Sequence, residues 1–301
     1  LEAGEVPPGQ AERLARELVL RREKLPTIPT LIRETVAATA ADVEEAAHML
    51  YLAPSIHIMA TRLTAVAKEG ALKVREVVLN HTEGFEGSEF KHGPNTILGF
   101  NTLLGPLEVQ TLLSRLGRTL DQLVLRASEQ GADSGAIRRL VQAAADAPFS
   151  PTSPALSLNP GEGALFNEVV DRADLLSVMD GQYPLIYITG ADERDTQLTV
   201  SQINTHKIRG ANTVVIAEEH PALRQAATKA PAGCQEYRAV YIQLPRTNDT
   251  LMACFSATVV LQRLALEMSL HKKAYLDRLG IKDHGVHPDV PKNVSKSITV
   301  D

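Results

Sequence analysis

Hydrophobic and polar positions divide the chain into short apolar runs and longer stretches in which apolar residues recur every three to four positions. Buried strands are expected where a short apolar run is bounded by turn-forming residues, at residues 55–60, 184–189, 211–217 and 237–245. Helical spacing follows the first three of these runs, at residues 64–79, 195–209 and 221–229. Strands that alternate with helices predict an α/β fold with a parallel sheet.

Further helices are expected outside this alternating pattern. A charged helix is expected at residues 10–24, helical spacing covers 31–52, and a long apolar helix covers 249–270. Residues 107–147 hold two helical runs, and a third follows at 164–179 after a Pro/Ser-rich stretch that is either a flexible connector or a lid. The expected organisation is a lead-in and helix at 1–29, an α/β domain at 30–106 and 181–301, and a helical insertion at 107–180.

Composition narrows the class of protein. The 301 residues are 44% hydrophobic and 22% charged, as in folded soluble proteins, and the net charge of −5 without a basic stripe argues against nucleic-acid binding. Cys234 and Cys254 lack metal-ligand spacing, which favours free thiols in a reducing compartment. We see neither a signal peptide nor an apolar run that would span a bilayer, so a cytoplasmic location without membrane attachment is expected. Because the sequence begins at Leu1, we also expect a fragment or a processed product.

Acid, base and turn residues are most concentrated at residues 68–94, KEGALKVREVVLNHTEGFEGSEFKHGP. Glu69 and Lys73 are four residues apart, and Lys73 and Glu76 are three apart, so the three side chains share one face of the expected helix. Such a face can transfer protons. The structural alternative is a solvated ladder of ion pairs.

A glycine-rich loop is expected after this helix. Gly84 and Gly87 suit a sharply turning backbone, and His92-Gly93-Pro94 would end the loop in a stiff, extended step. Histidine titrates near neutral pH, so His92 is a candidate acid or base, with a purely structural histidine as the alternative.

Three segments of the chain together resemble a known family. KEGALKVREVV, SEFKHGP and the terminal DVPKNVSKSITVD resemble, in order and spacing, the second sugar isomerase (SIS) subdomain of the glucosamine-6-phosphate synthases, the isomerising glutamine:fructose-6-phosphate amidotransferases. The resemblance covers residues 30–106 and 181–301. It implies an α/β fold of three layers, in which helices flank a flavodoxin-like parallel sheet, with the helical insertion added.

The resemblance also implies roles for individual residues. Glu76 matches the carboxylate that moves a proton between C1 and C2 of the open-chain sugar, and Lys73 matches the lysine that assists it. His92 matches the histidine associated with ring opening, which in the family reaches the site of the neighbouring subunit. Lys296 matches the tail lysine that forms a Schiff base with the ketose, and the same motifs make Lys91 and Ser295 candidates for substrate binding. Neither a metal nor a cofactor is implied.

The chain departs from the family in three places. We find no counterpart of the first SIS subdomain, which carries the sugar-phosphate cradle, and the glutaminase domain is also absent from these residues. The nearest candidate for a phosphate site is Thr189-Gly190 with Thr196 and Thr199, which is a weak match. Glycine is missing after the first strand, where the family has Gly-Arg-Gly.

The function implied by the resemblance is the isomerase half of a glucosamine-6-phosphate synthase, an aminotransferase that converts fructose 6-phosphate and glutamine-derived ammonia to glucosamine 6-phosphate. The expected partners are the sugar phosphate, further copies of the chain in a homo-oligomer, and an upstream first SIS subdomain and glutaminase, covalently joined or separate. Two alternatives stay open: a non-catalytic SIS module that binds a sugar phosphate and regulates a partner, and a stand-alone phosphosugar isomerase or deaminase that acts without glutamine.

Overall fold

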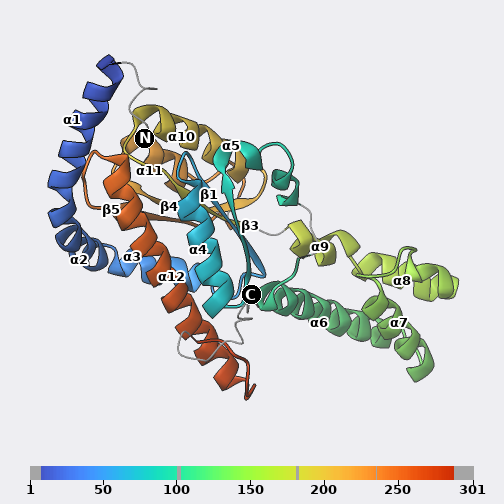
Figure 1. Cartoon of the computed structure of the whole chain (residues 1–301). Coiled ribbons are helices and arrows are strands. Elements are labelled where there is room, and N and C mark those ends of the chain that lie inside the picture. The colour runs from blue at the N-terminus through green and yellow to red at the C-terminus, as the bar shows by residue number, and fades with distance from the viewer. Residues whose placement is uncertain (1–7, 100–102, 181–182, 235, 288–301) are drawn as a thin grey trace, which may run out of the picture.

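Five parallel strands form the centre of the protein in a computed structural model that describes residues 8–99, 103–180, 183–234 and 236–287 (Figure 1). The strand order is β2-β1-β3-β4-β5, which is the flavodoxin-like order. All four neighbouring pairs are parallel. The strands are β1 Ser55–Ala60, β2 His81–Glu86, β3 Tyr183–Ile188, β4 Ala211–Glu218 and β5 Ala239–Leu244.

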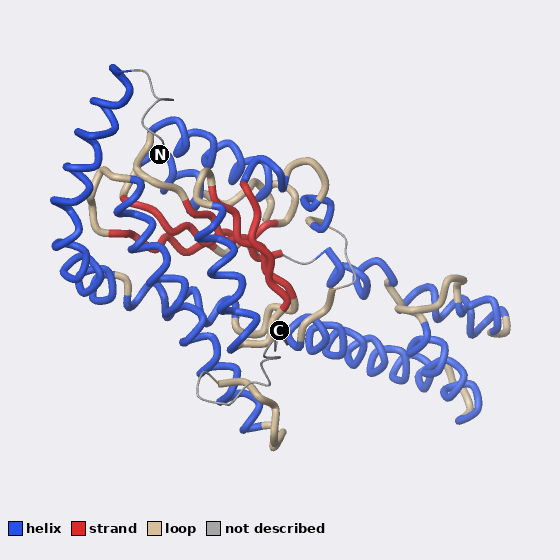
Figure 2. Tube along the Cα trace, viewed as in Figure 1, coloured by secondary structure: helices blue, strands red, loops and turns tan. Residues whose placement is uncertain are grey.

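Helices cover both faces of the sheet (Figure 2). One face carries α3 (Ala40–Leu50), α4 (Thr64–Val77) and α12 (Thr250–Arg278), whose apolar residues form one core with the isoleucines and valines of the strands. On the same face, α2 (Ile28–Ala38) packs against α12. The opposite face carries α5 (Gly87–Phe90), α10 (Glu193–Lys207) and α11 (Pro221–Thr228) around a second core. The α/β fold with three layers is therefore confirmed.

Glycines set how closely α4 packs. A Cβ atom on Gly70 would lie 2.6 Å from Leu261 of α12, and a Cβ atom on Gly84 would lie 2.6 Å from the backbone nitrogen of Lys68 in α4. Gly84 lies in the middle of β2, and Gly87 is the first residue of α5. The expected sharply turning loop is therefore wrong, because Gly84 is required for close contact between strand and helix rather than for a turn.

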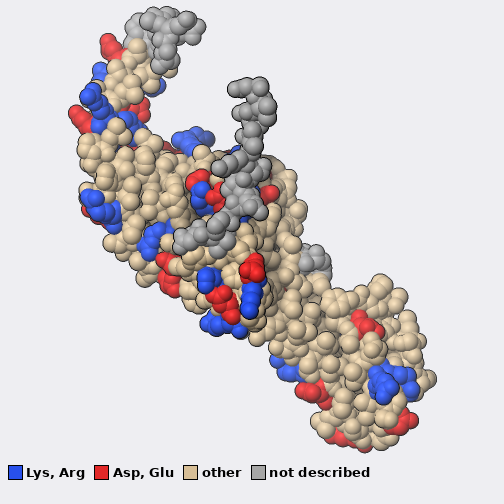
Figure 3. All heavy atoms as spheres, turned by 60° about the horizontal axis from the view of Figure 1, so that its bottom comes forward, with Lys and Arg blue, Asp and Glu red and all other residues tan. Residues whose placement is uncertain are grey.

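Helices α6 to α9 lie between β2 and β3 in the chain and extend to one side of the sheet, as the ribbon and the space-filling view show (Figures 1 and 3). They enclose a core of their own, in which Leu123, Leu140, Phe166 and Leu175 are almost completely buried. We call this group of helices the arm. Acidic and basic side chains are interspersed on the face that Figure 3 shows. The arm consists of α6 Pro106–Glu129, α7 Ser134–Asp146, α8 Pro160–Val169 and α9 Arg172–Leu176.

The first helix, α1 (Pro8–Lys24), is attached to the start of α12 by charge. Arg21 Nη1 lies 2.6 Å and Lys24 Nζ 2.5 Å from the carboxylate of Asp249, the residue that caps α12. The helical spacing at 31–52 corresponds to two helices, α2 and α3, which are interrupted at Thr39. Short 3₁₀ helices complete the described chain: η1 Leu25–Thr27, η2 Pro94–Ile97, η3 Pro154–Ser157 and η4 Ser177–Asp180.

Within the described residues, α12 is the one helix long and apolar enough to cross a membrane by length and composition. Half of that apolar stretch is buried inside the protein. It packs against α2, α3 and α4, so its apolar character is explained by its place in the core.

Candidate functional site

The ladder of charges expected on α4 is present in the structure. Lys73 Nζ lies 2.8 Å from Glu76 Oε2 and 3.8 Å from Glu69 Oε1. The hydrogen bond to Glu76 raises the pKa of Lys73 above its ordinary value, so this ammonium stays protonated at neutral pH. The Glu76 side chain is 47% exposed. Since β1 and β2 are parallel, α4 runs back against them, and Glu76 lies at the edge of the sheet where the strands begin.

The end of α4 is connected to both of its neighbouring helices through Asn80. The Asn80 amide donates a 2.8 Å hydrogen bond to the carbonyl of Ala53, beyond α3, and its oxygen accepts a 2.5 Å hydrogen bond from Lys272 of α12. Burial lowers the pKa of Lys272. Gly285, on the segment that leads to the C-terminus, lies beside Leu79, since a Cβ atom added there would be 3.9 Å from a Leu79 methyl group. The described chain therefore ends close to the helix that carries Glu76.

The structure does not bring His92 to Glu76. His92 and Lys91 are exposed and follow α5, at the edge of the sheet where the strands end. The step through Gly93 leads into the 3₁₀ helix η2, so the expected extended conformation at this step is wrong. The six residues of β2 lie between the end of α4, which carries Glu76, and the segment that carries His92. An extended strand of this length spans about 20 Å.

The remaining residues assigned from the terminal motif, Lys296 and Ser295, lie outside the described residues. The structure therefore positions one part of the implied catalytic set, Lys73 and Glu76, as a contacting pair. It places His92 elsewhere in the same chain.

The weak phosphate-site candidate lies at the edge of the sheet where the strands end. Thr189, Gly190 and Thr196 line a cavity of about 240 Å³ between β3, β4 and the start of α10. Thr199 does not line it, because its hydroxyl lies 2.9 Å from that of Thr61 and donates to the carbonyl of Asp195.

Three carboxylates, from Glu193, Glu218 and Glu219, line this cavity against two basic side chains, Arg246 and His220, and this balance disfavours phosphate. Asp195 is 1% exposed and faces Arg62, whose Nε is 3.2 Å away, and burial raises the pKa of Asp195. Glu218 lines the cavity and accepts hydrogen bonds from the backbone amides of Thr247 and Asn248. A carboxylate thus occupies the amide groups that could otherwise bind an anion.

A polar cluster that the sequence pattern does not predict lies where β1, β2 and β3 begin, with Ser55, His57 and Tyr183 buried and His81 exposed. Ser55 Oγ is 2.7 Å from His81 Nδ1 and accepts a 2.5 Å hydrogen bond from the Tyr183 hydroxyl, which is 2.8 Å from His57 Nδ1. Burial, with a contribution from His81, lowers the pKa of His57 to about 4. Alternation along β1 places Ser55 and His57 on one face of the sheet. Tyr183 lies beside them because β3 is the neighbour of β1 in the sheet, which the sequence pattern does not reveal.

A cavity of about 90 Å³ opens beside this cluster, lined by Ser55, Tyr183, Leu107 and Val178 among others. It is smaller than the roughly 300 Å³ that is typical of small-molecule sites. Neither this cavity nor the one beside Thr189 is lined by Glu76, Lys73 or His92.

Comparison with known proteins identifies relatives for part of the chain. No protein-family model matches the chain. The C-terminal domain of glucosamine-fructose-6-phosphate aminotransferase from Francisella tularensis is a structural neighbour with a TM-score of 0.46 and 12% sequence identity, over 89% of this chain and 47% of that chain.

Three curated relatives share one name, glutamine–fructose-6-phosphate aminotransferase (isomerizing). The protein of Pyrobaculum aerophilum is 34% identical over 82 residues, 27% of this chain and 14% of its own length. That of Mycobacterium tuberculosis is 36% identical over 76 residues, 25% of this chain and 12% of its own length. That of Aquifex aeolicus is 30% identical over 115 residues, 32% of this chain and 18% of its own length. The matched part spans less than a fifth of each relative. In this chain, the matched part covers up to about a third of the length, and there the sequence is related to the glutamine–fructose-6-phosphate aminotransferases.

Proposed function

We propose that this chain is the isomerase half of a glucosamine-6-phosphate synthase, converting fructose 6-phosphate and ammonia derived from glutamine to glucosamine 6-phosphate. The sequence relationship to the aminotransferases supports this class of reaction. The observation that carries the proposal is the Lys73–Glu76 contact at the solvent-facing end of α4, beside the segment that leads to the C-terminal tail. An aldose–ketose isomerisation needs a carboxylate base of this kind beside the sugar carbonyl.

Each residue would have a distinct part in the proposed reaction. The amine of Lys296 attacks the C2 carbonyl of the open-chain ketose, and loss of water gives the Schiff base. After ammonia has displaced the lysine as its free amine, Glu76 takes the proton from C1 while the imine nitrogen gains a proton, which gives an enolamine. Glu76 then returns its proton to C2 as the C1 hydroxyl loses its proton, which gives the aldehyde and the amine of the product. Lys73, kept protonated by its contact with Glu76, stabilises the negative charge that develops on the substrate oxygen.

The proposed site is completed by other chains or domains. His92 lies at the opposite end of β2 from Glu76, so the imidazole that opens the sugar ring would come from a second copy of the chain. The carboxylates around Thr189 disfavour phosphate, so a first SIS subdomain would hold the phosphate group. We therefore propose a cytoplasmic homo-oligomer that acts with this subdomain and a glutaminase.

Substitution of Glu76 tests the proposed base. Glu76→Gln keeps the size of the side chain and its contact with Lys73 but removes the base, so proton transfer between C1 and C2 should slow by about 10²–10⁴-fold. The measurement is deuterium uptake from solvent into the sugar phosphate by NMR, with the full chain and its first SIS subdomain. Glu69→Gln is the matched control, because Glu69 also faces Lys73 one turn earlier and should keep its activity. Equal rates for both variants would exclude Glu76 as the base.

A non-catalytic SIS module is the second candidate, favoured by the exposure of Glu76 and by its absence from the cavities beside Thr189 and Ser55. Trapping with fructose 6-phosphate and borohydride separates the two functions. Sugar mass on the peptide that contains Lys296 indicates the enzyme. Saturable binding of fructose 6-phosphate without that label indicates the regulatory module.

A further inference from the structure

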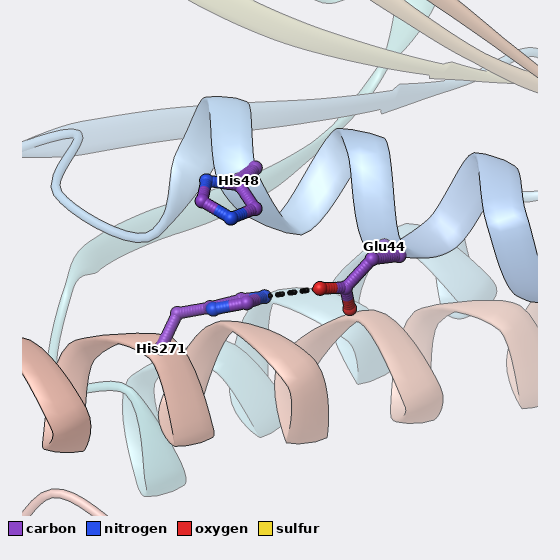
Figure 4. Close-up of side chains that lie close together, drawn as sticks. All are labelled: Glu44, His48 and His271. Atoms are coloured by element: carbon purple, nitrogen blue, oxygen red, sulfur yellow. Dashed lines mark ion pairs between the residues drawn. The ribbon is translucent and has the colours of Figure 1, made fainter.

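Two helices that are far apart in the sequence bring together three potential metal ligands. Glu44 and His48 lie on successive turns of α3, and both point toward His271 on α12, as Figure 4 shows. The Nε2 atom of His271 is 2.9 Å from Glu44 Oε1, and the two imidazole rings have centroids 4.4 Å apart. One ligand atom from each residue lies within 4.8 Å of the others.

The contacts within this group leave one nitrogen unsatisfied. His271 Nε2 is buried but makes no hydrogen bond, because Glu44 Oε1 lies near it without the geometry of a hydrogen bond. The imidazole rings are inclined by 45°, so they do not stack. A buried ring nitrogen that faces a carboxylate and a second imidazole is the arrangement that a bound cation would satisfy.

The ligand types select a class of cation. Two imidazoles and one carboxylate suit Zn²⁺ and the neighbouring transition metals, whereas Mg²⁺ and Ca²⁺ require oxygen ligands. We propose that Glu44, His48 and His271 bind one divalent metal ion of the zinc class, with the remaining coordination position open to water.

Small side-chain movements would complete this site. With metal–nitrogen distances of about 2.0–2.1 Å, ligand atoms in a tetrahedral site lie roughly 3.4 Å apart. Since the ligand atoms all lie within 4.8 Å of one another, no pair has to approach by more than about 1.4 Å. His48 and Glu44 are exposed and project from consecutive turns of one helix, so changes in their rotamers can supply this movement without moving the backbone.

Binding would join α3 to α12 near the end of α4. Lys272, next to His271, already bonds to Asn80, and Asn80 bonds to the carbonyl groups beyond α3. The metal site is separate from the proposed isomerase residues, and its role is to hold these helices together. Its test is therefore independent of enzyme activity.

Zinc titration of the full chain without a histidine tag, stripped with a chelator and dialysed, tests the proposal. Calorimetry should show one Zn²⁺ bound per chain, and the Tm should rise by roughly 5 °C when free zinc is about a hundredfold above the dissociation constant. Co²⁺ should give visible absorption bands of low-coordinate cobalt. Mg²⁺ should produce neither effect.

Variants identify the ligands. His48→Ala and His271→Ala should abolish the cobalt bands and the zinc-dependent shift in Tm. Glu44→Gln changes an exposed side chain and should weaken zinc binding by roughly tenfold or more. The matched controls are Glu45→Gln and His220→Ala, which should bind zinc like the unmodified chain. Glu45 is the neighbouring exposed acid, and the His220 imidazole faces a single carboxylate. Unchanged zinc affinity in Glu44→Gln and His48→Ala, or no zinc binding by the unmodified chain, would overturn the proposal.

Discussion

At the scale of single residues, glycines of the α4–β2 unit are selected by packing. Gly70 leaves room for Leu261, and Gly84 leaves room for the backbone of α4 at Ala67 and Lys68. The two contacts differ, since a leucine side chain can move aside but a helix backbone cannot. The glycine in the GALK motif thus contributes to the packing of α4 on α12, while the neighbouring Lys73 and Glu76 face solvent.

Gly84→Ala should destabilise the protein. The new methyl group would lie 2.6–2.8 Å from backbone atoms of α4, so either the helix or β2 must shift, at a cost of about 3 kcal/mol in the free energy of unfolding. Urea denaturation measures this change. Gly117→Ala is the control, because its Cβ would meet open space and a helical alanine should stabilise by about 1 kcal/mol. Equal effects at the two positions would refute the packing explanation.

Two buried histidines should make the protein sensitive to acid. Burial lowers the pKa of both His57 and His206 to about 4, with smaller contributions from His81 to His57 and from Arg209 and Lys91 to His206. Between pH 6.5 and 4 the unfolded chain takes up protons that the folded chain does not bind. The stability is therefore complete above pH 6.5 and should fall by on the order of 2–3 kcal/mol per histidine as the pH approaches 4.

Urea denaturation across this pH range checks the expected loss. His206→Gln can still pair with the Tyr187 hydroxyl but removes one titrating group, so its stability should depend less steeply on pH. An unchanged slope would show that other groups cause the acid sensitivity.

At the scale of elements, strands with continuous apolar character were predicted within one or two residues, and the strand with polar character was missed. β1 lies at the predicted residues 55–60, whereas β2, HTEGFE, has two acids and a central glycine, a pattern that predicts a loop. β2 is an edge strand, so burial constrains its side chains less. Similarly, α12 continues to Arg278 through residues whose polar character suggested a shorter helix.

The candidate site was predictable only where its residues are close in sequence. The spacing of Glu69, Lys73 and Glu76 correctly predicted that they share one helical face. The cluster around Ser55 and Tyr183 could not be predicted, because its members meet only through the order of the strands. The catalytic roles assigned to these residues stay predictions.

The attachment of α1 should depend on Asp249. Asp249→Ala removes the carboxylate that pairs with Arg21 and Lys24. It also removes the helix cap that accepts a hydrogen bond from the Leu251 amide, and loss of this cap alone lowers the free energy of unfolding by about 1 kcal/mol. Backbone amides of α1 should then exchange with deuterium faster, which mass spectrometry would detect. Arg22→Ala, at an exposed position on the same helix, should leave exchange unchanged. Slow exchange in Asp249→Ala would show that apolar contacts hold α1.

At the scale of the whole molecule, the proposed acid–base residues lie at opposite ends of the sheet. Glu76 is near the beginning of the strands, and His92 is beyond their ends. A single chain therefore cannot place both side chains on one sugar. A symmetric pair of chains can do so at two equivalent sites.

Mixing two inactive variants tests for a shared site. Glu76→Gln and His92→Ala chains should each have little activity alone, but a mixed dimer contains one site with both native residues. Random reassociation should therefore restore about a quarter of the unmodified activity. The measurement is formation of glucosamine 6-phosphate after joint unfolding and refolding, with the first SIS subdomain and ammonia supplied. No recovery, with mixed dimers confirmed by mass spectrometry, would exclude a site that takes Glu76 from one chain and His92 from the other.

The position of the arm has a consequence for how the protein folds. β1 pairs with β3, so His57 lies opposite Leu185 and the whole arm separates the two central strands along the chain. Joining such distant segments costs chain entropy and slows folding. Leu107 and Val178, near the two ends of the arm, line the same small cavity. If the arm folds first, its two ends are already close together and it connects them like a short loop. Pairing of β1 with β3 then requires closure of a much shorter flexible chain and should be correspondingly faster.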